Sequence, residues 1–233
     1  DSIITGNSCD LYGGGVYVDA TSEFIMHSGE ISSNVAQGGS SMTCGGGVYN
    51  RGKFTLNNGI VKGNTSVSGS SSGNNGGGVY NAKEAEFIMN GGEISANTAA
   101  GPSAHGGGVN NAGIFKMTGG EIARNNMNCG YAYGVGLYNS GTFEMTGGKI
   151  SGNNCGSGGT HYGGGIYNSN SGTVTLTDGE ITNNKVSASG ASYGGGICSA
   201  GTFLMHGGLI SGNSLSGSAK YGAGIHVSGG NFE

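Results

Sequence analysis

The sequence predicts an all-β protein, a right-handed parallel β-helix (a solenoid) of about eight coils with three short strands in each coil. Three observations support this fold class. A Gly-rich block recurs along the 233 residues with a period of 28 to 32 residues, apolar residues fall at the same positions of each repeat, and an Asn follows the last apolar run of each repeat. A fixed period near thirty is typical of one supersecondary unit stacked on itself.

The Gly-rich block reads Gly-Gly-Gly-Val-Tyr-Asn at 45–50 and 76–81, and Gly-Gly-Gly-Ile-Tyr-Asn at 163–168. With its weaker copies included, the block begins at Gly13, Gly45, Gly76, Gly106, Gly134, Gly163, Gly194 and Gly222. Because the repeats extend over the whole sequence, we expect residues 1–233 to form a single β-helix repeat domain. This domain starts and ends in the middle of a repeat.

Each repeat is expected to hold three strands separated by turns. In the fifth repeat these are the end of the Gly block at 134–139, the run 142–145 and the run 149–153, in which apolar and polar residues alternate. Such alternation, bounded by Gly and Asn, indicates short strands. Stacked coils pair their backbone groups as parallel strands. Crossovers between parallel strands are right-handed in about 98% of cases.

Three other architectures were weighed against this one. A β-propeller needs blades of four antiparallel strands and about 40 residues. The 55 Gly residues also suggest collagen or low-complexity disorder, but there is one Pro and Gly does not recur at every third position, as collagen requires. Apolar residues at fixed positions argue against disorder, because they allow the chain to bury a core.

The alternation predicts interior columns that stack from coil to coil. The column from the second strand is Phe24, Phe54, Phe87, Phe115, Phe143, Val174, Phe203 and Phe232. Burying one such side chain contributes roughly 1.5–3 kcal/mol. The repeats can therefore build a sizeable core despite their Gly content.

An Asn closes the third strand in all eight copies, and we expect its side chain to lie at an inward corner. The predicted Asn ladder is Asn7, Asn34, Asn64, Asn97, Asn125, Asn153, Asn183 and Asn213. A stacked amide can bond the backbone of the turn and the next amide above it. We interpret this column as structural.

The loops after the ladder are predicted to emerge at one corner and to form one side of the cylinder, which in solenoids is often the binding face. The residue before each Gly block is Tyr12, Cys44, Asn75, His105, Tyr133, Tyr162, Tyr193 or Tyr221. The five Tyr residues of this column are candidates for glycan contact. The alternative is that the rings stack on one another and stiffen the corner.

Five Cys residues occur, and four of them lie in loops of neighbouring coils. We expect two disulfides, Cys9–Cys44 and Cys129–Cys155, because adjacent coils bring such loops close together. Cys198 has no evident mate. Two disulfides are typical of an oxidising exterior.

No catalytic residue, metal site or cofactor is predicted. The acidic column of Glu30, Glu93, Glu121 and Glu180 lies outside the third strand, with Lys149 in the same register. Paired carboxylates can act as acid and base, but these are interpreted as a solvated face. The five His residues lack zinc spacing and Cys partners.

The composition excludes several classes of partner. Nine Lys and Arg stand against 13 Asp and Glu, which gives a net charge of −4 and no basic stripe for a nucleic acid. No run of 18 apolar residues is present, so no membrane-spanning helix is expected in this segment. The first residues also lack the pattern of a signal peptide.

The motif Gly-Gly-Gly-Val-Tyr-Asn, followed by Phe-x-Met-x-Gly-Gly-Glu-Ile-Ser-x-Asn, resembles the Gly-rich β-helix repeats of microbial surface proteins. Those include adhesin-like proteins and, more loosely, the passengers of polymorphic outer-membrane proteins. The resemblance covers essentially the whole chain. It implies an extracellular or cell-surface protein with a structural or adhesive role.

Two functions remain open from the sequence. The first is an extracellular structural or adhesive β-helix, part of a surface fibre or stalk, with copies of itself, further repeats or glycans as partners. The second is a carbohydrate-active enzyme, since parallel β-helices also host polysaccharide lyases and hydrolases, and fold alone does not decide function. The regular repeat favours the first, because active sites usually break local rules.

The chain opens at a third strand, Ile3 to Asn7, and stops just after Phe232. Joined end to end, two copies would nearly complete one coil. Within the chain the second-strand Phe lies ten residues before the ladder Asn, or nine from Val174 to Asn183, and across the joined ends the count is eight. We therefore expect either head-to-tail stacking into filaments or an excerpt of a longer array.

Overall fold

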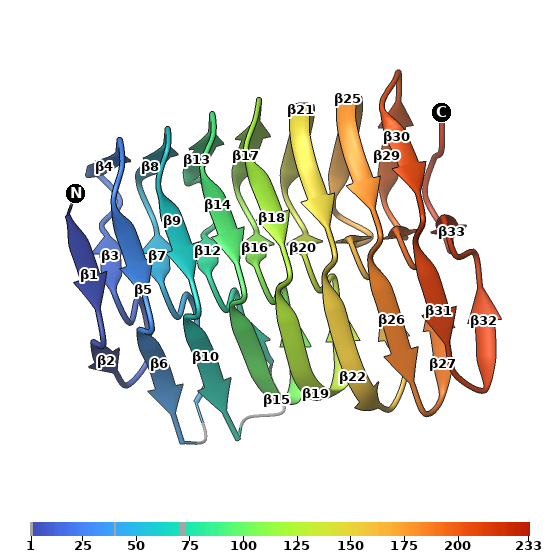
Figure 1. The fold of residues 1–233 in the computed structure, drawn as a ribbon, viewed down its shortest axis with the longest axis horizontal. Helices are drawn as coiled ribbons and strands as arrows, with labels where there is room; N and C mark the ends of the chain where they lie inside the picture. The colour runs from blue at the N-terminus through green and yellow to red at the C-terminus, as the bar shows by residue number, and fades with distance from the viewer. Residues whose placement is uncertain (1, 40, 70–72) are drawn as a thin grey trace.

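The computed structural model describes residues 2–39, 41–69 and 73–233. The regular structure of these residues is all β, in parallel sheets of 13, 12 and 8 strands. In Figure 1 the coils advance across the picture from the N to the C end. The chain descends on the near side and climbs behind it, in the right-handed sense. A parallel β-helix of about eight coils is thus confirmed.

The eight-stranded sheet is formed by the last residues of the Gly blocks, which we call the first row. Its strands are β3 (Val16–Val18), β7 (Val48–Asn50), β12 (Val79–Asn81), β16 (Val109–Asn111), β20 (Leu137–Asn139), β24 (Ile166–Asn168), β28 (Ile197–Ser199) and β33 (Ile225–Val227). Equivalent residues of neighbouring repeats lie opposite each other, as in Val48↔Val79. The period of the sequence therefore sets the register.

The 13-stranded sheet holds the second and third rows. The second row is β4 (Glu23–Met26), β8 (Lys53–Leu56), β13 (Glu86–Met89), β17 (Ile114–Met117) and β29 (Thr202–Met205). The third row is β1 (Ile3–Thr5), β5 (Glu30–Ser32), β9 (Ile60–Lys62), β14 (Glu93–Ser95), β18 (Glu121–Ala123) and β30 (Leu209–Ser211). In two coils one long strand spans both rows, β21 (Thr142–Ser151) and β25 (Thr173–Thr182).

The 12-stranded sheet corrects the expectation of three strands per coil, because the segments taken for loops also pair. The fourth row is β2 (Ser8–Cys9), β6 (Val35–Gly38), β10 (Thr65–Ser68), β15 (Thr98–His105), β19 (Asn126–Tyr133), β22 (Asn154–Gly158), β26 (Lys185–Ala188) and β31 (Ser214–Ser216). The fifth row is β11 (Asn74–Asn75), β23 (His161–Tyr162), β27 (Ala191–Tyr193), β32 (Ala219–Tyr221) and the ends of β15 and β19. Small inward residues such as Ala36, Ser66 and Ala99 are fully buried, and their size allows the fourth and fifth rows to pack closely together.

The main core lies inside the first three rows. Its predicted Phe column is confirmed up to Phe203: the rings from Phe24 to Phe143 stack with centroids 4.5 to 5.5 Å apart, whereas Phe232 in the last coil is 47% exposed. Val174 replaces Phe in the sixth coil and is also fully buried. Stacked rings at one strand spacing combine area burial with favourable aromatic contact.

A second, smaller core lies between the fourth and fifth rows. It contains Ala99, Met127, Val135, Cys155 and Val186, each at most 1% exposed. The Asn ladder and the Gly blocks separate the two cores. The predicted structural residues therefore lie at the boundary between the two cores of each coil, which we call the waist.

Candidate functional site

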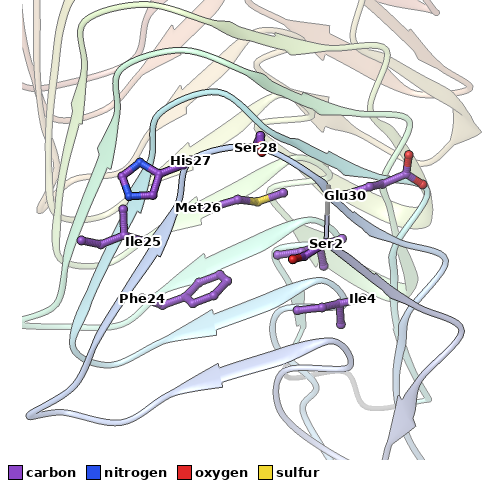
Figure 2. A pocket seen from close by; sticks show the side chains of 9 residues that line it. Ser2, Ile4, Phe24, Ile25, Met26, His27, Ser28 and Glu30 are labelled. Atoms are coloured by element: carbon purple, nitrogen blue, oxygen red, sulfur yellow. The ribbon is translucent and has the colours of Figure 1, made fainter.

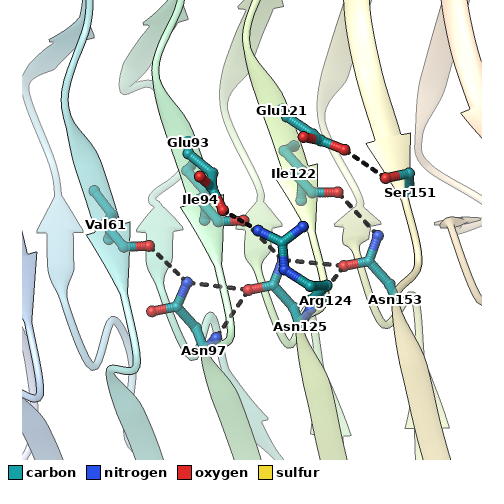
Figure 3. A network of polar contacts seen from close by, with 10 residues as sticks. All are labelled: Val61, Glu93, Ile94, Asn97, Glu121, Ile122, Arg124, Asn125, Ser151 and Asn153. Atoms are coloured by element: carbon teal, nitrogen blue, oxygen red, sulfur yellow. Dashed lines mark hydrogen bonds and ion pairs between the residues drawn. The ribbon is translucent and has the colours of Figure 1, made fainter.

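The Asn ladder is present at the waist of the coil, with the side chains of its middle members fully buried. Each Nδ2 donates to Oδ1 of the next ladder Asn at 2.9 to 3.0 Å. Figure 3 shows Asn125, whose Nδ2 also donates to the carbonyl of Ile94 at 2.9 Å. Its Oδ1 accepts the backbone N–H of Asn97 at 3.0 Å. Every polar atom of this amide is therefore satisfied within the core.

In the sixth coil the ladder residue is Asn184 and not the predicted Asn183. Asn153 Nδ2 donates to Asn184 Oδ1 at 2.9 Å, and Asn184 Nδ2 donates to Asn213 Oδ1 at 3.0 Å. Asn183 instead has a left-handed backbone with φ of 56°. The second-strand residue then precedes the ladder Asn by ten residues in this coil as in the others.

The residue before each ladder Asn has a left-handed backbone in all eight coils. Four of these residues are Gly and four are not, and φ ranges from 52° to 69°. The members are Gly6, Ser33, Gly63, Ala96, Arg124, Gly152, Asn183 and Gly212. Asn adopts this conformation more readily than most residues, which explains why Asn183 serves the turn and Asn184 the ladder.

The three Gly residues of the block have three separate tasks at the waist. In the third coil, Gly76 makes the turn with φ of 62°. A Cβ on Gly77 would lie 2.5 Å from the carbonyl carbon of Thr98, and one on Gly78 would lie 2.8 Å from Nδ2 of Asn97. The second Gly thus allows close approach of the fourth row, and the third makes room for the ladder amide.

A second amide column closes the first row. Asn50, Asn81, Asn111 and Asn139 each donate Nδ2 to the next Oδ1 at 2.7 to 3.0 Å. Asn168 continues the column by donating to Ser199 Oγ at 3.1 Å. From the second coil to the seventh, two parallel amide columns therefore tie each coil to the next.

All five Cys residues are free thiols, so the predicted disulfides are wrong. The strand register explains the first failure: Cys9 lies opposite Ala36, and Cys44 lies opposite Tyr12. Cys129 lies opposite Gly101. The two predicted pairs therefore belong to positions that the parallel register does not place opposite each other.

The second predicted pair fails for the same reason, because Cys155 lies opposite Met127 and not opposite Cys129. Burial raises the pKa of the Cys44, Cys129 and Cys198 thiols to about 12, and that of Cys155 to about 11. These four thiols are protonated at neutral pH. A thiol in this state is a poor nucleophile.

The acidic column lies on the open outer face of the third row, where ion pairs link neighbouring coils. Lys62 Nζ lies 2.8 Å from Glu30, and Lys149 Nζ lies 3.3 Å from Glu180. The hydrogen bond with Lys62 lowers the pKa of Glu30. Figure 3 shows that Glu93 meets Arg124 and that Glu121 accepts a hydrogen bond from Ser151.

Four of the five candidate glycan-contact residues form one continuous stack. Tyr133, Tyr162, Tyr193 and Tyr221 have centroids 4.9 to 5.0 Å apart and interplanar angles of 4° to 10°. Tyr12 is separated from them and packs instead on Tyr49 at 4.8 Å. Both faces of Tyr162 and Tyr193 are covered by neighbouring rings, so these residues offer edges and hydroxyls to a ligand.

A second aromatic column stands beside the first on the outer face of the first row. Tyr17, Tyr49 and Tyr80 stack at 5.1 Å. After an interruption at Asn110, Tyr138 and Tyr167 stack at 5.6 Å. The two columns touch where Tyr167 meets Tyr133 edge to face at 5.2 Å.

Both columns are interrupted at adjacent places by a polar cluster, Asn75, His105 and Asn110. Asn75 Oδ1 accepts a hydrogen bond from Asn110 Nδ2 at 2.9 Å and lies 3.1 Å from His105 Nδ1. Because an amide oxygen can only accept, Nδ1 carries the proton and Nε2 is an acceptor. Asn75 Nδ2 also donates to Cys44 Sγ at 3.6 Å.

Burial lowers the pKa of His105 to about 4, so its imidazole is neutral at physiological pH. The ring packs on Tyr133 at 5.2 Å and edge-on to Tyr138 at 4.8 Å. Asn75 and His105 belong to the column of residues before the Gly blocks, but the sequence predicted no role for them. The signal in the sequence was Asn75 and Asn110, polar residues at positions where most copies carry Tyr, although Cys44 and Cys198 also depart from the aromatic pattern.

A hollow of about 390 Å³ lies at the first coil, lined by Ile4, Phe24, Met26 and Ile31 among others (Figure 2). These side chains belong to the core columns. The hollow is the open end of the main core.

Within the described ranges, no group of three or more His, Cys, Asp or Glu is placed to hold a metal ion. In the same residues no helix has the length and apolar character needed to cross a membrane. No family model, curated protein or solved structure matches this chain.

Proposed function

We propose that this chain is an extracellular structural and adhesive β-helix, part of a cell-surface fibre or stalk. The observation that carries the proposal is the unbroken stack. Backbone pairing and the Asn ladder tie each coil to the next from Asn7 to Asn213. Such an element keeps its length under load and displays the same surface positions at regular intervals, which suits a spacer that bears contact residues.

Stacking of further coils is part of the proposal. Strand β1 pairs on one side only, with β5, and β33 pairs only with β28. Unpaired strand edges favour the addition of another coil, supplied by a copy of this chain or by more repeats of the same kind.

A carbohydrate-active enzyme receives less support from the geometry. Glu30, Glu93 and Glu180 are engaged in ion pairs on an open sheet face. The thiol of Cys44 and the imidazole of His105 are separated by Asn75, and burial favours the neutral form of both. Neither arrangement supplies the poised base that a nucleophile needs.

Immunogold labelling of intact and permeabilised source cells tests the proposed location. We expect gold particles on the outer surface of intact cells, along thin projections. Label that appears only after permeabilisation would contradict the proposal. A protein of the periplasm or cell interior would give that second pattern.

A further inference from the structure

Over the middle coils, the charged residues lie away from the first and fifth rows. Between Lys62 and Lys220, all Asp, Glu, Lys and Arg lie in the segments 83–93, 116–124, 144–149 and 178–185. These segments lie in the second and third rows and the turns beside them, except that Lys185 begins β26 of the fourth row. The opposite side, formed by the first and fifth rows, carries no formal charge from residue 63 to residue 219, and Lys220 in β32 follows this stretch. We call it the neutral side.

The neutral side carries a repeating line of hydroxyl groups. We call Tyr133, Tyr162, Tyr193 and Tyr221 the tyrosine track; their centroids repeat every 4.9 to 5.0 Å. In the described part of the chain, the hydroxyls of Tyr162 and Tyr193 have no protein partner, and their rings are half-buried. Their faces are occupied by neighbouring rings, so hydrogen bonding at the edge is the contact they offer.

The track ends at the polar notch, which we define as Asn75, His105 and Asn110. Its side chains are positioned before any ligand arrives, since Asn75 bonds both of the others. Gly73 packs on the imidazole, where an added Cβ would lie 2.7 Å from Cε1 and Nδ1. Asn75 and Asn110 are buried, at 7% and 3% exposed, and the imidazole is half-buried, so His105 is the member of the notch that a ligand can reach. Preorganised polar groups lower the entropic cost of binding.

We propose that the tyrosine track and the polar notch together bind an uncharged, extended, β-linked polysaccharide that lies along the axis of the solenoid. The inference rests on the adhesive role proposed above and names its ligand class. Consecutive rings of an extended β-linked sugar chain advance by a distance similar to the spacing of the track. Successive sugar hydroxyls can therefore meet successive Tyr hydroxyls.

The charge distribution selects against other extended polymers. A uronate chain or a nucleic acid would place anionic groups on the neutral side without a cationic partner, and burying an unpaired charge is costly. A hydroxyl-rich neutral chain meets phenol, amide and imidazole groups that all form hydrogen bonds. Because no ion pair is involved, binding is expected to be insensitive to salt.

Isothermal titration calorimetry with the full chain tests the proposal. The probes are linear hexasaccharides of β-1,4-linked glucose and of β-1,4-linked N-acetylglucosamine, with hexagalacturonate as the charged comparator. We expect at least one neutral probe to bind equally well at low and high salt, and the uronate not to bind. Binding of the uronate alone, or of no probe, would overturn the proposal.

Variants separate edge contact from ring stacking. The double variant Tyr162→Phe, Tyr193→Phe keeps the stack and removes two hydroxyls, so affinity should fall about tenfold or more. His105→Phe keeps the ring on Tyr133 and should weaken binding to a similar extent. Glu144→Gln, on the charged side, is the matched control and should bind as the parent does. Thermal unfolding verifies that each variant is folded.

Unchanged affinity in the folded Tyr-to-Phe double variant would overturn the role of the track. Unchanged affinity in folded His105→Phe would overturn that of the notch. These results are independent of the labelling experiment, because a surface protein that binds neither neutral hexasaccharide retains the proposed location and loses only this ligand.

Discussion

At the scale of single residues, the ladder Asn and the buried His have opposite effects on the core. Asn125 fills every hydrogen-bonding capacity of its amide inside the protein. His105 forms a hydrogen bond to Asn75 through one ring nitrogen, and burial destabilises the charged form of its imidazole. Asn125 therefore only stabilises the fold, whereas His105 makes the free energy of unfolding depend on pH.

Asn125→Ala should lower the free energy of unfolding by about 1–3 kcal/mol, because it leaves the backbone N–H of Asn97 and the carbonyl of Ile94 unpaired in the core. Denaturant titration measures the change. The matched control is Asn126→Ala, at an exposed position one residue on, which should stay within about 0.5 kcal/mol of the parent. Equal stability of the two variants would contradict the ladder.

Stability should fall as the pH drops from about 6.5 towards 4. The unfolded chain takes up a proton on His105 near its ordinary pKa of 6.5, whereas in the fold that pKa is lowered to about 4. The unfolded state thus binds more protons in this window, and the loss is at most about 3 kcal/mol. The pKa of His161 is also lowered and adds in the same direction.

His105→Gln should reduce this pH dependence in denaturant titrations at about pH 7 and about pH 4.5. The parallel variant His161→Gln serves as the comparison for the second buried imidazole. A variant that carries both substitutions tests the two His residues together. If its free energy of unfolding kept the full pH dependence, carboxylates, and not these His residues, would control stability in this range.

At the scale of the coil, the waist depends on the Gly block. Gly78 leaves room for the amide of Asn97, with 2.8 Å between a built Cβ and Nδ2. Gly156, in β22, has nothing within 4 Å of a built Cβ. The same substitution therefore has different consequences at the two sites.

Gly78→Ala should destabilise the protein by about 1–3 kcal/mol, because the added methyl forces the ladder or the next coil to shift. Gly156→Ala, with open space around it, should change stability by no more than about 0.5 kcal/mol. Thermal unfolding of both variants gives the comparison. If Gly78→Ala melted with the parent, the proposed packing of ladder against Gly block would be wrong.

Much of the coil was predictable because the signals repeat. The Phe column and seven ladder Asn residues recur at one phase, and parallel stacking then fixes their register. The fourth and fifth rows were missed because Ala36, Ser66 and Ala99 are too small to show an apolar alternation. Asn183 and Asn184 are adjacent, so only backbone geometry distinguishes them. The disulfides failed because the sequence does not reveal which loop residues lie opposite each other.

At the scale of the whole molecule, the solenoid separates two tasks on two sides. The second and third rows carry the ion pairs between coils, as with Lys116 and Glu86 at 3.1 Å. The neutral side carries the tyrosine track and the polar notch. The polar notch is one place where the repeat departs from its own pattern, and such departures from local regularity are characteristic of functional sites.

Nuclear magnetic resonance mapping of the backbone amides during titration with the β-1,4-linked glucose hexasaccharide tests this division of sides most directly. The account predicts shift changes at Tyr133, Tyr162 and Tyr193 and around His105, with none at Glu93. Changes confined to the second and third rows, or no changes anywhere, would contradict it.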